Sequence, residues 1–208
     1  MSFRRQQIIV FLLLLIGASL AIYKVTRPGH GTIRFEISEQ DGGQTAFVYG
    51  GTDSASYGVT KRFLDDNPQI NRLVLKRMPG TVDADTNLRI ARMIRQRGLS
   101  THLERRSYIA SGAVDLFLSG YERTMACGAK IGVHSWSYHS QNNIGVFSPK
   151  NLGSDRRRGV QEKFLKDMGH DPRFYTFTRD AADADEIYIL LPKDIARFKL
   201  LTEETCQG

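Results

Sequence analysis

Strand-like and helix-like hydrophobic patterns alternate along most of this chain. Residues 32–37 alternate polar and apolar side chains, which predicts a half-buried strand. Within residues 70–78, the run Leu73-Val74-Leu75 is continuously apolar, as a strand in a sheet covered on both faces requires. Residues 83–98 repeat apolar side chains at helical spacing and end at a glycine, which predicts an amphipathic helix with a C-terminal glycine cap.

The same patterns predict the other elements of the domain. Further strands are expected at residues 45–49, 100–103 and 129–133, and a strand-like run occupies residues 187–191. Further helices are expected at residues 54–66, 111–118, 155–168 and 192–198, with a polar loop at residues 139–152. Strands that alternate with helices indicate an α/β domain with a mainly parallel sheet and flanking helices.

An uninterrupted apolar run precedes this domain. Residues 8–23 contain no charge, two arginines precede them, and Lys24 and Arg27 follow. The first interpretation is one N-terminal transmembrane helix, although a full span needs about 20 residues and snorkelling would have to extend this one. The second is a cleaved signal peptide, because Ser19-Leu20-Ala21 resembles a cleavage site. The third, a buried core helix, lacks the polar face expected of it.

The residues after this run read as a linker and then as one domain. We therefore divide the chain into a membrane anchor or signal segment, residues 1–27, and a single α/β domain, residues 28–208. Basic residues flank the run on both sides, so charge does not set its orientation. If Arg4 and Arg5 stay in the cytoplasm, an uncleaved anchor holds the domain on the extracytoplasmic side. Under the alternative interpretation, cleavage of a signal peptide releases the domain on that same side.

Charge and cysteine content narrow the partners. The net charge is +7, but beyond residue 27 the chain has 25 basic and 22 acidic residues, a net of +3. The basic run at residues 156–158 is typical of a solvated helix face, so no nucleic-acid partner is expected. Cys127 and Cys206 fit no metal-ligand spacing, so no metal site is expected either. The two cysteines form a disulfide in an oxidising compartment or remain buried thiols.

Three places carry residues suited to acyl-transfer chemistry. Gly80 and Thr81 follow a predicted strand, where a glycine turn exposes backbone N–H groups; taken alone, they favour an ordinary strand-to-helix turn. Ser111 opens an apolar helix between small residues, as a nucleophile does; taken alone, it favours a helix N-cap. His134 ends a predicted strand 23 residues after Ser111. It suits either a catalytic base or a buried structural histidine.

Together these residues resemble the Clp protease and crotonase-like superfamily, in its ClpP-like serine-hydrolase branch. The shared order is strand, Pro-Gly turn, helix, strand, small-Ser-small helix start and strand ending in His, over residues 46–201. The resemblance implies that Ser111 is the nucleophile and His134 the base. It implies that Gly80, Thr81 and Gly112 supply the oxyanion hole, with Thr81 standing where the family has a second glycine.

The resemblance also implies a catalytic acid before the last helix. Asp185 is our choice, with Asp183 and Glu186 as alternatives and Asp180 as a further one. The implied function is a membrane-anchored serine hydrolase, acting as a peptidase without a cofactor on a peptide or ester substrate. Relatives assemble through the region here at residues 155–168, so a homo-oligomer is expected. The rivals are an esterase, an inactive binding module, and a Ser–Lys peptidase, which the lack of a lysine after a comparable strand disfavours.

Overall fold

Two sheets and a small hairpin form the strand framework of the computed structural model, which describes residues 33–135, 138–139, 146–147 and 157–203. The larger sheet has the order β1-β2-β3-β5-β7, and the smaller has the order β11-β8-β6-β4. Every neighbouring pair is parallel except β1 with β2, β11 with β8, and β9 with β10. The predicted mainly parallel α/β architecture is therefore confirmed.

The strands are short. They are β1 (Arg34–Ile37), β2 (Thr45–Tyr49), β3 (Arg72–Leu75), β4 (Arg77–Met78), β5 (Ser100–Leu103), β6 (Tyr108–Ala110), β7 (Arg123–Met125), β8 (Lys130–Val133), β9 (Tyr138–His139), β10 (Val146–Phe147) and β11 (Tyr188–Ile189). The hairpin of β9 and β10 falls within or beside the predicted loop at residues 139–152, and the rest of that loop lies outside the described residues.

The chain crosses from the larger sheet to the smaller one three times. β3 leads into β4, β5 into β6, and β7 into β8. At the first crossing, the Lys76 N–H donates to the Val48 carbonyl of the larger sheet at 2.9 Å. The Lys76 carbonyl accepts from the Tyr108 N–H of the smaller sheet at 2.7 Å. The prediction of one strand at residues 70–78 was therefore wrong, because the hydrogen-bond partners change at Lys76.

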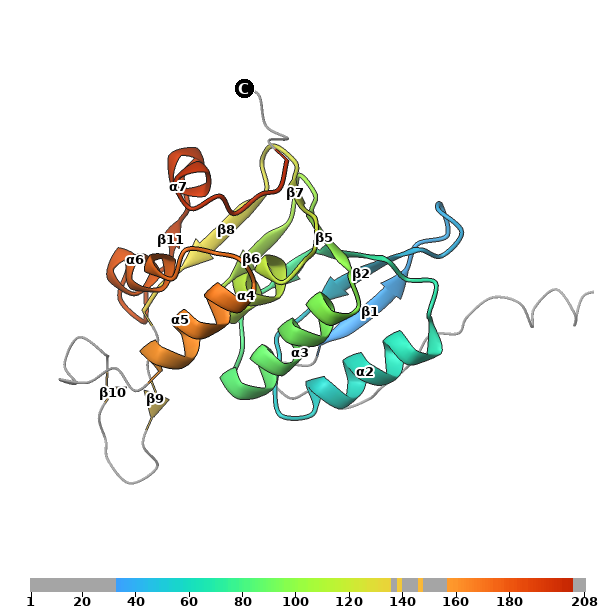
Figure 1. Ribbon diagram of the computed structural model, residues 1–208, viewed down its shortest axis with the longest axis horizontal. Helices are drawn as coiled ribbons and strands as arrows, with labels where there is room; N and C mark the ends of the chain where they lie inside the picture. Colours follow the sequence, from blue (N-terminus) through green and yellow to red (C-terminus); the bar gives the residue numbers. More distant parts are fainter. Residues whose placement is uncertain (1–32, 136–137, 140–145, 148–156, 204–208) are drawn as a thin grey trace, which may run out of the picture.

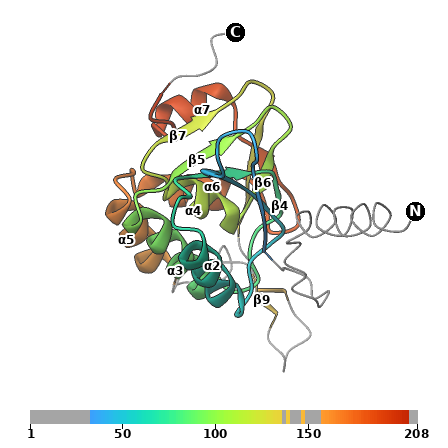
Figure 2. The same ribbon diagram turned by 90° about the vertical axis from the view of Figure 1, so that its right-hand side faces the viewer.

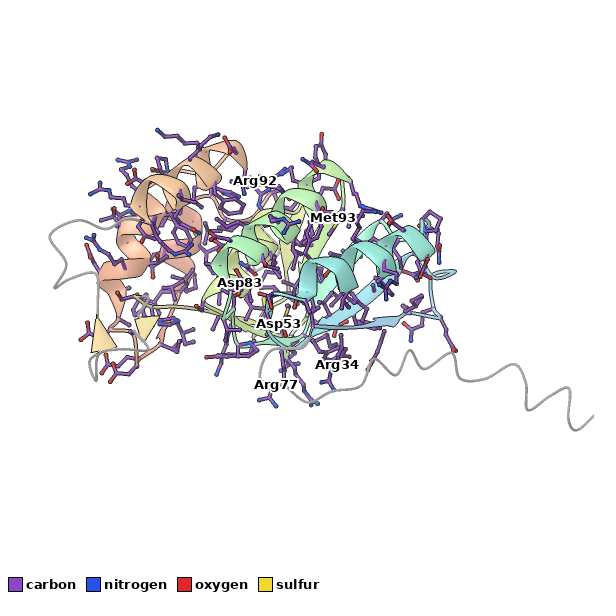
Figure 3. The ribbon with its side chains drawn as sticks, turned by 90° about the horizontal axis from the view of Figure 1, so that it is seen from below. Arg34, Asp53, Arg77, Asp83, Arg92 and Met93 are labelled. Atoms are coloured by element: carbon purple, nitrogen blue, oxygen red, sulfur yellow. The ribbon has the colours of Figure 1, made fainter. Side chains whose placement is uncertain are left out.

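Six helices are described. They are α2 (Ser56–Asp66), α3 (Ala84–Gln96), α4 (Gly112–Leu118), α5 (Arg158–Asp167), α6 (Arg173–Ala181) and α7 (Pro192–Arg197). Helices α2, α3 and α4 lie in sequence beside one another in Figure 1, and Figure 2 shows the same layer edge-on. In Figure 3, Arg92 and Met93 of α3 lie on one side of the molecule, and Arg34 and Arg77 project from its strands on the other. The sequence did not predict α6.

Helix α4 is the most deeply buried helix of the described part of the chain. Leu116, Phe117 and Leu118 are at most 2% exposed, and all three belong to the main hydrophobic core. Full burial of one such side chain stabilises the fold by about 1.5–3 kcal/mol. Because α4 is anchored in this way, its first residues have a rigid support.

The ends of the chain are described only in part. Among the described residues, no helix has the length and apolarity needed to cross a bilayer. The apolar run at residues 8–23 and the division between residues 27 and 28 lie outside them. Cys127 is disulfide-bonded, so it is not a buried free thiol, and Cys206, the other cysteine of the sequence, lies outside the described residues.

Candidate active site

Three neighbouring strands of the smaller sheet end at the same edge. β4, β6 and β8 are parallel, with Met78 opposite Ile109 and Ala110 opposite Gly132. Gly80 lies just beyond β4, and Ser111 and His134 directly follow β6 and β8. Parallel strands present their carboxyl ends at one edge, which is where ligands bind in open α/β sheets. The three places selected from the sequence are therefore brought to one edge.

Ser111 has an unusual backbone for its position at the start of α4. Its φ is 55° and its ψ is −130°, and its side chain makes no capping hydrogen bond. A positive φ at a non-glycine residue costs about 1–3 kcal/mol, and such residues cluster at functional sites. The N-cap interpretation of Ser111 is therefore wrong, because the hydroxyl does not bond to the helix. The half-buried hydroxyl remains available for other chemistry.

The turn after β4 touches Ser111 closely. Gly80 has a φ of 132°, and a Cβ added to it would lie 2.8 Å from the Ser111 Cβ and 3.3 Å from the Ser111 Oγ. Real Cβ atoms essentially never come within 3.0 Å of another heavy atom. Glycine is therefore required at residue 80 both for its backbone conformation and for the approach of the turn to Ser111.

Thr81 and Gly112 make a second contact between the same two segments. A Cβ added to Gly112 would lie 2.5 Å from the Thr81 Cγ2 atom. Thr81 is not among the described non-glycine residues with positive φ, so its backbone does not need the glycine that the family has there. Its hydroxyl accepts from the Asp83 N–H at 3.0 Å, which turns the side chain back along its own segment.

In the described part of the chain, the N–H groups of Gly80, Thr81 and Gly112 have no hydrogen-bond partner. Unpaired N–H groups beside a serine hydroxyl at a helix N-terminus suit the binding of a developing negative charge. The arrangement is compatible with the predicted oxyanion hole.

His134 is half-buried, and one nitrogen of its ring lacks a hydrogen bond among the described residues. The Nδ1 atom is buried without a hydrogen-bond partner among the described residues, as is the hydroxyl of its neighbour Ser135. Burial lowers the pKa of His134, and the backbone groups of Ala184 and Ser135 partly oppose this shift, although neither is placed for a hydrogen bond to Nδ1. The imidazole is therefore neutral near pH 7, the form that a general base needs. No hydrogen bond joins it to Ser111 in this part of the chain.

The acidic segment lies beside His134 without presenting a carboxylate to it. β11 pairs with β8, and the Ser135 N–H donates to the Ala182 carbonyl at 2.9 Å, so residues 183–186 pass next to the histidine. The side chains of Asp183, Asp185 and Glu186 are exposed, and Asp180 bonds to Arg179. The backbone of Ala184 is the part of this segment that acts on the ring. The assignment of Asp185 as the acid stays a prediction.

A buried polar network beneath the site was missed from the sequence. Asn87 of α3 is 1% exposed; its Oδ1 accepts from the Thr52 hydroxyl and its Nδ2 donates to the Gly112 carbonyl, both at 2.8 Å. Asp115 of α4 accepts from the Gln161 Nε2 at 2.6 Å and lies 3.4 Å from the Asn87 Nδ2. The only sequence signal was an asparagine on the apolar side of the helix at residues 83–98.

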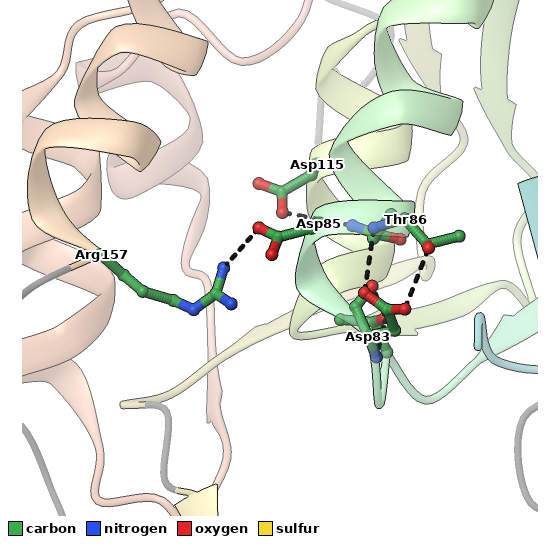
Figure 4. Close-up of polar contacts among 7 residues, drawn as sticks. Asp83, Asp85, Thr86, Asp115 and Arg157 are labelled. Carbon is green, nitrogen blue, oxygen red and sulfur yellow. Dashed lines mark hydrogen bonds and ion pairs between the residues drawn. The ribbon is translucent and has the colours of Figure 1, made fainter. Parts of the chain in front are cut away.

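A second group of charges borders this network. Asp85, on the same helix as Asn87, pairs with Arg157 at 3.1 Å (Figure 4). Burial raises the pKa of Asp115 to about 7, while the Gln161 and Asn87 hydrogen bonds act in the opposite direction. Among the described residues, no group of histidine, cysteine, aspartate and glutamate has the arrangement of a metal site.

Comparison with known proteins supports the fold. A scan against protein-family models and a search of curated proteins found no match. Among solved structures, a serine-to-alanine mutant of the 1510-N membrane-bound stomatin-specific protease is 15% identical, with a TM-score of 0.55 over 75% of each chain. A lysine-to-alanine mutant of that protease with a substrate peptide is 16% identical, with a TM-score of 0.54 over 75% of this chain and 71% of the other.

A methylmalonyl CoA decarboxylase is also similar, at 12% identity, with a TM-score of 0.50 over 84% of this chain and 67% of the other. A protease and an acyl-CoA enzyme thus share one architecture with this chain. The chain has the fold of the Clp protease and crotonase-like superfamily. At these identities the similarity establishes the fold and leaves the activity to the residues of the site.

The first prediction concerns Gly80. We expect Gly80→Ala to destabilise the protein by about 1–3 kcal/mol because alanine is strained at this positive φ. The added methyl group would also clash with Ser111, which increases the loss of stability. Gly42→Ala is the matched control, because Gly42 has a φ of 67° and nothing near its missing Cβ. Thermal denaturation should show a larger loss at Gly80. Equal losses would mean that the turn does not approach Ser111 this closely.

The second prediction concerns Asp115. Its folded pKa of about 7 lies above the usual 3.8, so the folded state retains a proton that the unfolded state releases between about pH 4 and 7. Stability from this group is therefore present below pH 4 and lost as pH rises through 7, by up to about 4 kcal/mol before solvent screening. Asp115→Asn should be more stable than the wild type at pH 8 in urea, and the difference should shrink steadily as the pH is lowered towards 4. Parallel pH profiles of the two proteins would contradict the shift.

Proposed function

We propose that this chain is a membrane-anchored serine hydrolase with Ser111 as its nucleophile, and that it acts as a peptidase. The observation that carries the proposal is the Ser111 backbone. This non-glycine residue is held at positive φ at the start of a helix. Its hydroxyl makes no capping hydrogen bond and lies close to a glycine turn. This is the geometry of a nucleophile on a tight strand-to-helix turn. The similarity to a structure described as a stomatin-specific protease supports peptidase over esterase activity.

In the proposed mechanism, the Ser111 oxygen attacks the substrate carbonyl as neutral His134 removes its proton. The carbonyl oxygen becomes negative and is held by the N–H groups of Gly112 and of Gly80 or Thr81. His134 then returns the proton to the leaving amine or alcohol, which leaves an acyl-enzyme. Water, deprotonated by His134, attacks the acyl-enzyme; the bond to the Ser111 oxygen then breaks, this oxygen takes the proton back from His134, and the acid is released.

The third catalytic group is the open part of this mechanism. The buried Nδ1 atom of His134, which has no partner among the described residues, is where an orienting carboxylate would bond. Residues 183–186 pass beside it, and Asp185 remains our choice, which requires this segment to turn a carboxylate inward. A Ser–Lys site is the competing design, and the similar protease was solved with a lysine replaced. The only lysine here between β8 and α5 is Lys150, which lies outside the described residues.

The third prediction tests the enzyme. A fluorophosphonate probe should label the full-length wild type through loss of fluoride and formation of a bond from phosphorus to the Ser111 oxygen. Ser111→Ala should not be labelled, and His134→Ala should be labelled more slowly by a factor of about 100 or more. Ser119→Ala is the control, because its buried hydroxyl bonds only to the Leu116 carbonyl. Unlabelled wild-type protein with a normal fold would favour the inactive binding module.

The same assay separates the candidate partners of Ser111. If a carboxylate assists His134, one of Asp183→Ala, Asp185→Ala and Glu186→Ala should slow labelling while the fold is retained. If the site is of the Ser–Lys type, Lys150→Ala should abolish labelling and His134→Ala should leave it near normal. Model peptides and esters then distinguish peptidase from esterase activity.

The N-terminal segment carries the proposed location. The apolar run at residues 8–23 would anchor the domain on the extracytoplasmic side, or direct its release there after cleavage. The disulfide at Cys127 supports an oxidising compartment. A peptide or ester substrate is the proposed ligand, and assembly through residues 155–168 into a homo-oligomer remains part of the proposal.

The fourth prediction tests the anchor. Full-length protein should sediment with membranes and resist extraction by alkaline carbonate, whereas a chain beginning at Gly29 should fold and remain in the supernatant. The first described element of the larger sheet begins only at Arg34, so this truncation removes none of the described strands. A smaller mature mass in the supernatant would indicate signal cleavage. Failure of the shorter chain to fold would place the N-terminal segment in the core.

A further inference from the structure

The polar side chains beneath Ser111 connect the two segments that carry the proposed oxyanion donors. One segment is the turn from Gly80 to Val82, and the other is the start of α4 at Gly112. We propose that Thr52 and Asn87 are positioning residues, which hold these two segments in register so that their N–H groups converge beside Ser111. The inference rests on the proposed function and assigns a role to residues that do not touch the substrate.

Asn87 links both sides through one amide group. Its Nδ2 donates to the Gly112 carbonyl at 2.8 Å, and its Oδ1 accepts from the Thr52 hydroxyl at 2.8 Å. Asn87 and Thr52 are 1% and 0% exposed. Because water does not replace these bonds, removing the Thr52 hydroxyl or the Asn87 amide leaves a buried polar group unpaired. The amide therefore sets the separation between Thr52 and the first residue of α4.

Thr52 in turn brackets the glycine turn. Its N–H donates to the Gly80 carbonyl at 3.1 Å, and its carbonyl accepts from the Val82 N–H at 2.9 Å. The single hydrogen of the Thr81 hydroxyl has two acceptors within reach, the Asp83 carbonyl at 2.9 Å and the Thr52 carbonyl at 3.2 Å. These contacts form an isolated parallel bridge between Thr52 and Thr81.

The first of these bonds fixes the direction of one proposed donor. In a trans peptide the C=O and the following N–H point in opposite directions. Since the Gly80 carbonyl points at Thr52, the Thr81 N–H points away from Thr52, and it has no partner among the described residues. The Thr81 N–H is therefore the donor of this turn that Thr52 orients. Rotation of this peptide would change the direction of this N–H even if Ser111 and His134 stayed in place.

The fifth prediction tests this role through the Thr52 hydroxyl. Thr52→Val keeps the shape of the side chain but cannot donate to Asn87, whereas Thr52→Ser retains the hydroxyl. Labelling of full-length protein by the fluorophosphonate probe is resolved into the inactivation rate kinact and the binding constant KI. We expect Thr52→Val to lower kinact about 10- to 100-fold, because misplaced oxyanion donors weaken transition-state binding. KI and the pH midpoint of labelling, which report probe binding and His134, should remain unchanged.

Thr101→Val is the matched control. Thr101 is also 1% exposed, and its hydroxyl donates to the Phe117 carbonyl at 2.7 Å, at the far end of α4. Its loss should lower the melting temperature in the same way without changing kinact. Thr52→Ser should restore most of the rate lost in Thr52→Val. Asn87→Ala is the second variant and should lower kinact at least as much, so the test survives if Thr52→Val does not fold.

The outcomes separate this inference from the proposed function. If the wild type is not labelled, the serine-hydrolase proposal and this inference both fail. If the wild type is labelled at Ser111 but Thr52→Val reacts as fast as Thr101→Val, only the positioning role is overturned. Equal loss of rate in Thr52→Ser and Thr52→Val would also overturn it, because the hydroxyl would then not be the group that matters.

Discussion

Parallel pairing of β4, β6 and β8 is the constraint on which the rest of this site depends. It exists because the chain leaves the larger sheet after β3, β5 and β7 and enters the smaller one each time. Each crossing leads into a strand of four residues or fewer. The residues that follow these strands therefore lie at the same edge of the smaller sheet. A glycine turn, a serine and a histidine from distant parts of the sequence become neighbours for this reason.

The strain at Ser111 is supported by what surrounds it. The apolar side of α4 is buried in the core. Gly80 and Thr81 of the turn pack closely against Ser111 and Gly112. Burying the helix stabilises the fold, and that stabilisation offsets the cost of the positive φ. Thr52 and Asn87 complete the support by satisfying polar groups that would otherwise be unpaired beneath the site. The residues that hold Ser111 in position are thus different from the residue proposed to react.

Several features of the fold were predicted correctly because their signals are local. The helix at residues 83–98 has a strong amphipathic period and a glycine where its end requires positive φ, and α3 follows it with Gly98 at a φ of 66°. Two-residue and three-residue strands carry no such period. For that reason β6 and β7 were not anticipated, and β4 was merged with β3 into one strand. Helix α6 is short and lacks a capping side chain, so it too was missed.

The sequence by itself determined the class of the domain and the candidates Gly80, Ser111 and His134, because residue type and position at a strand end or a helix start are local properties, and Gly112 followed from the resemblance. Only the tertiary structure decided that Ser111 is not an N-cap, since that depends on its backbone angles and its free hydroxyl. It alone revealed Thr52 and Asn87, whose contacts join residues 35 and 25 positions apart. Hydrogen bonds between distant segments leave no periodic trace in a sequence, because they exist only after the sheets and helices have packed.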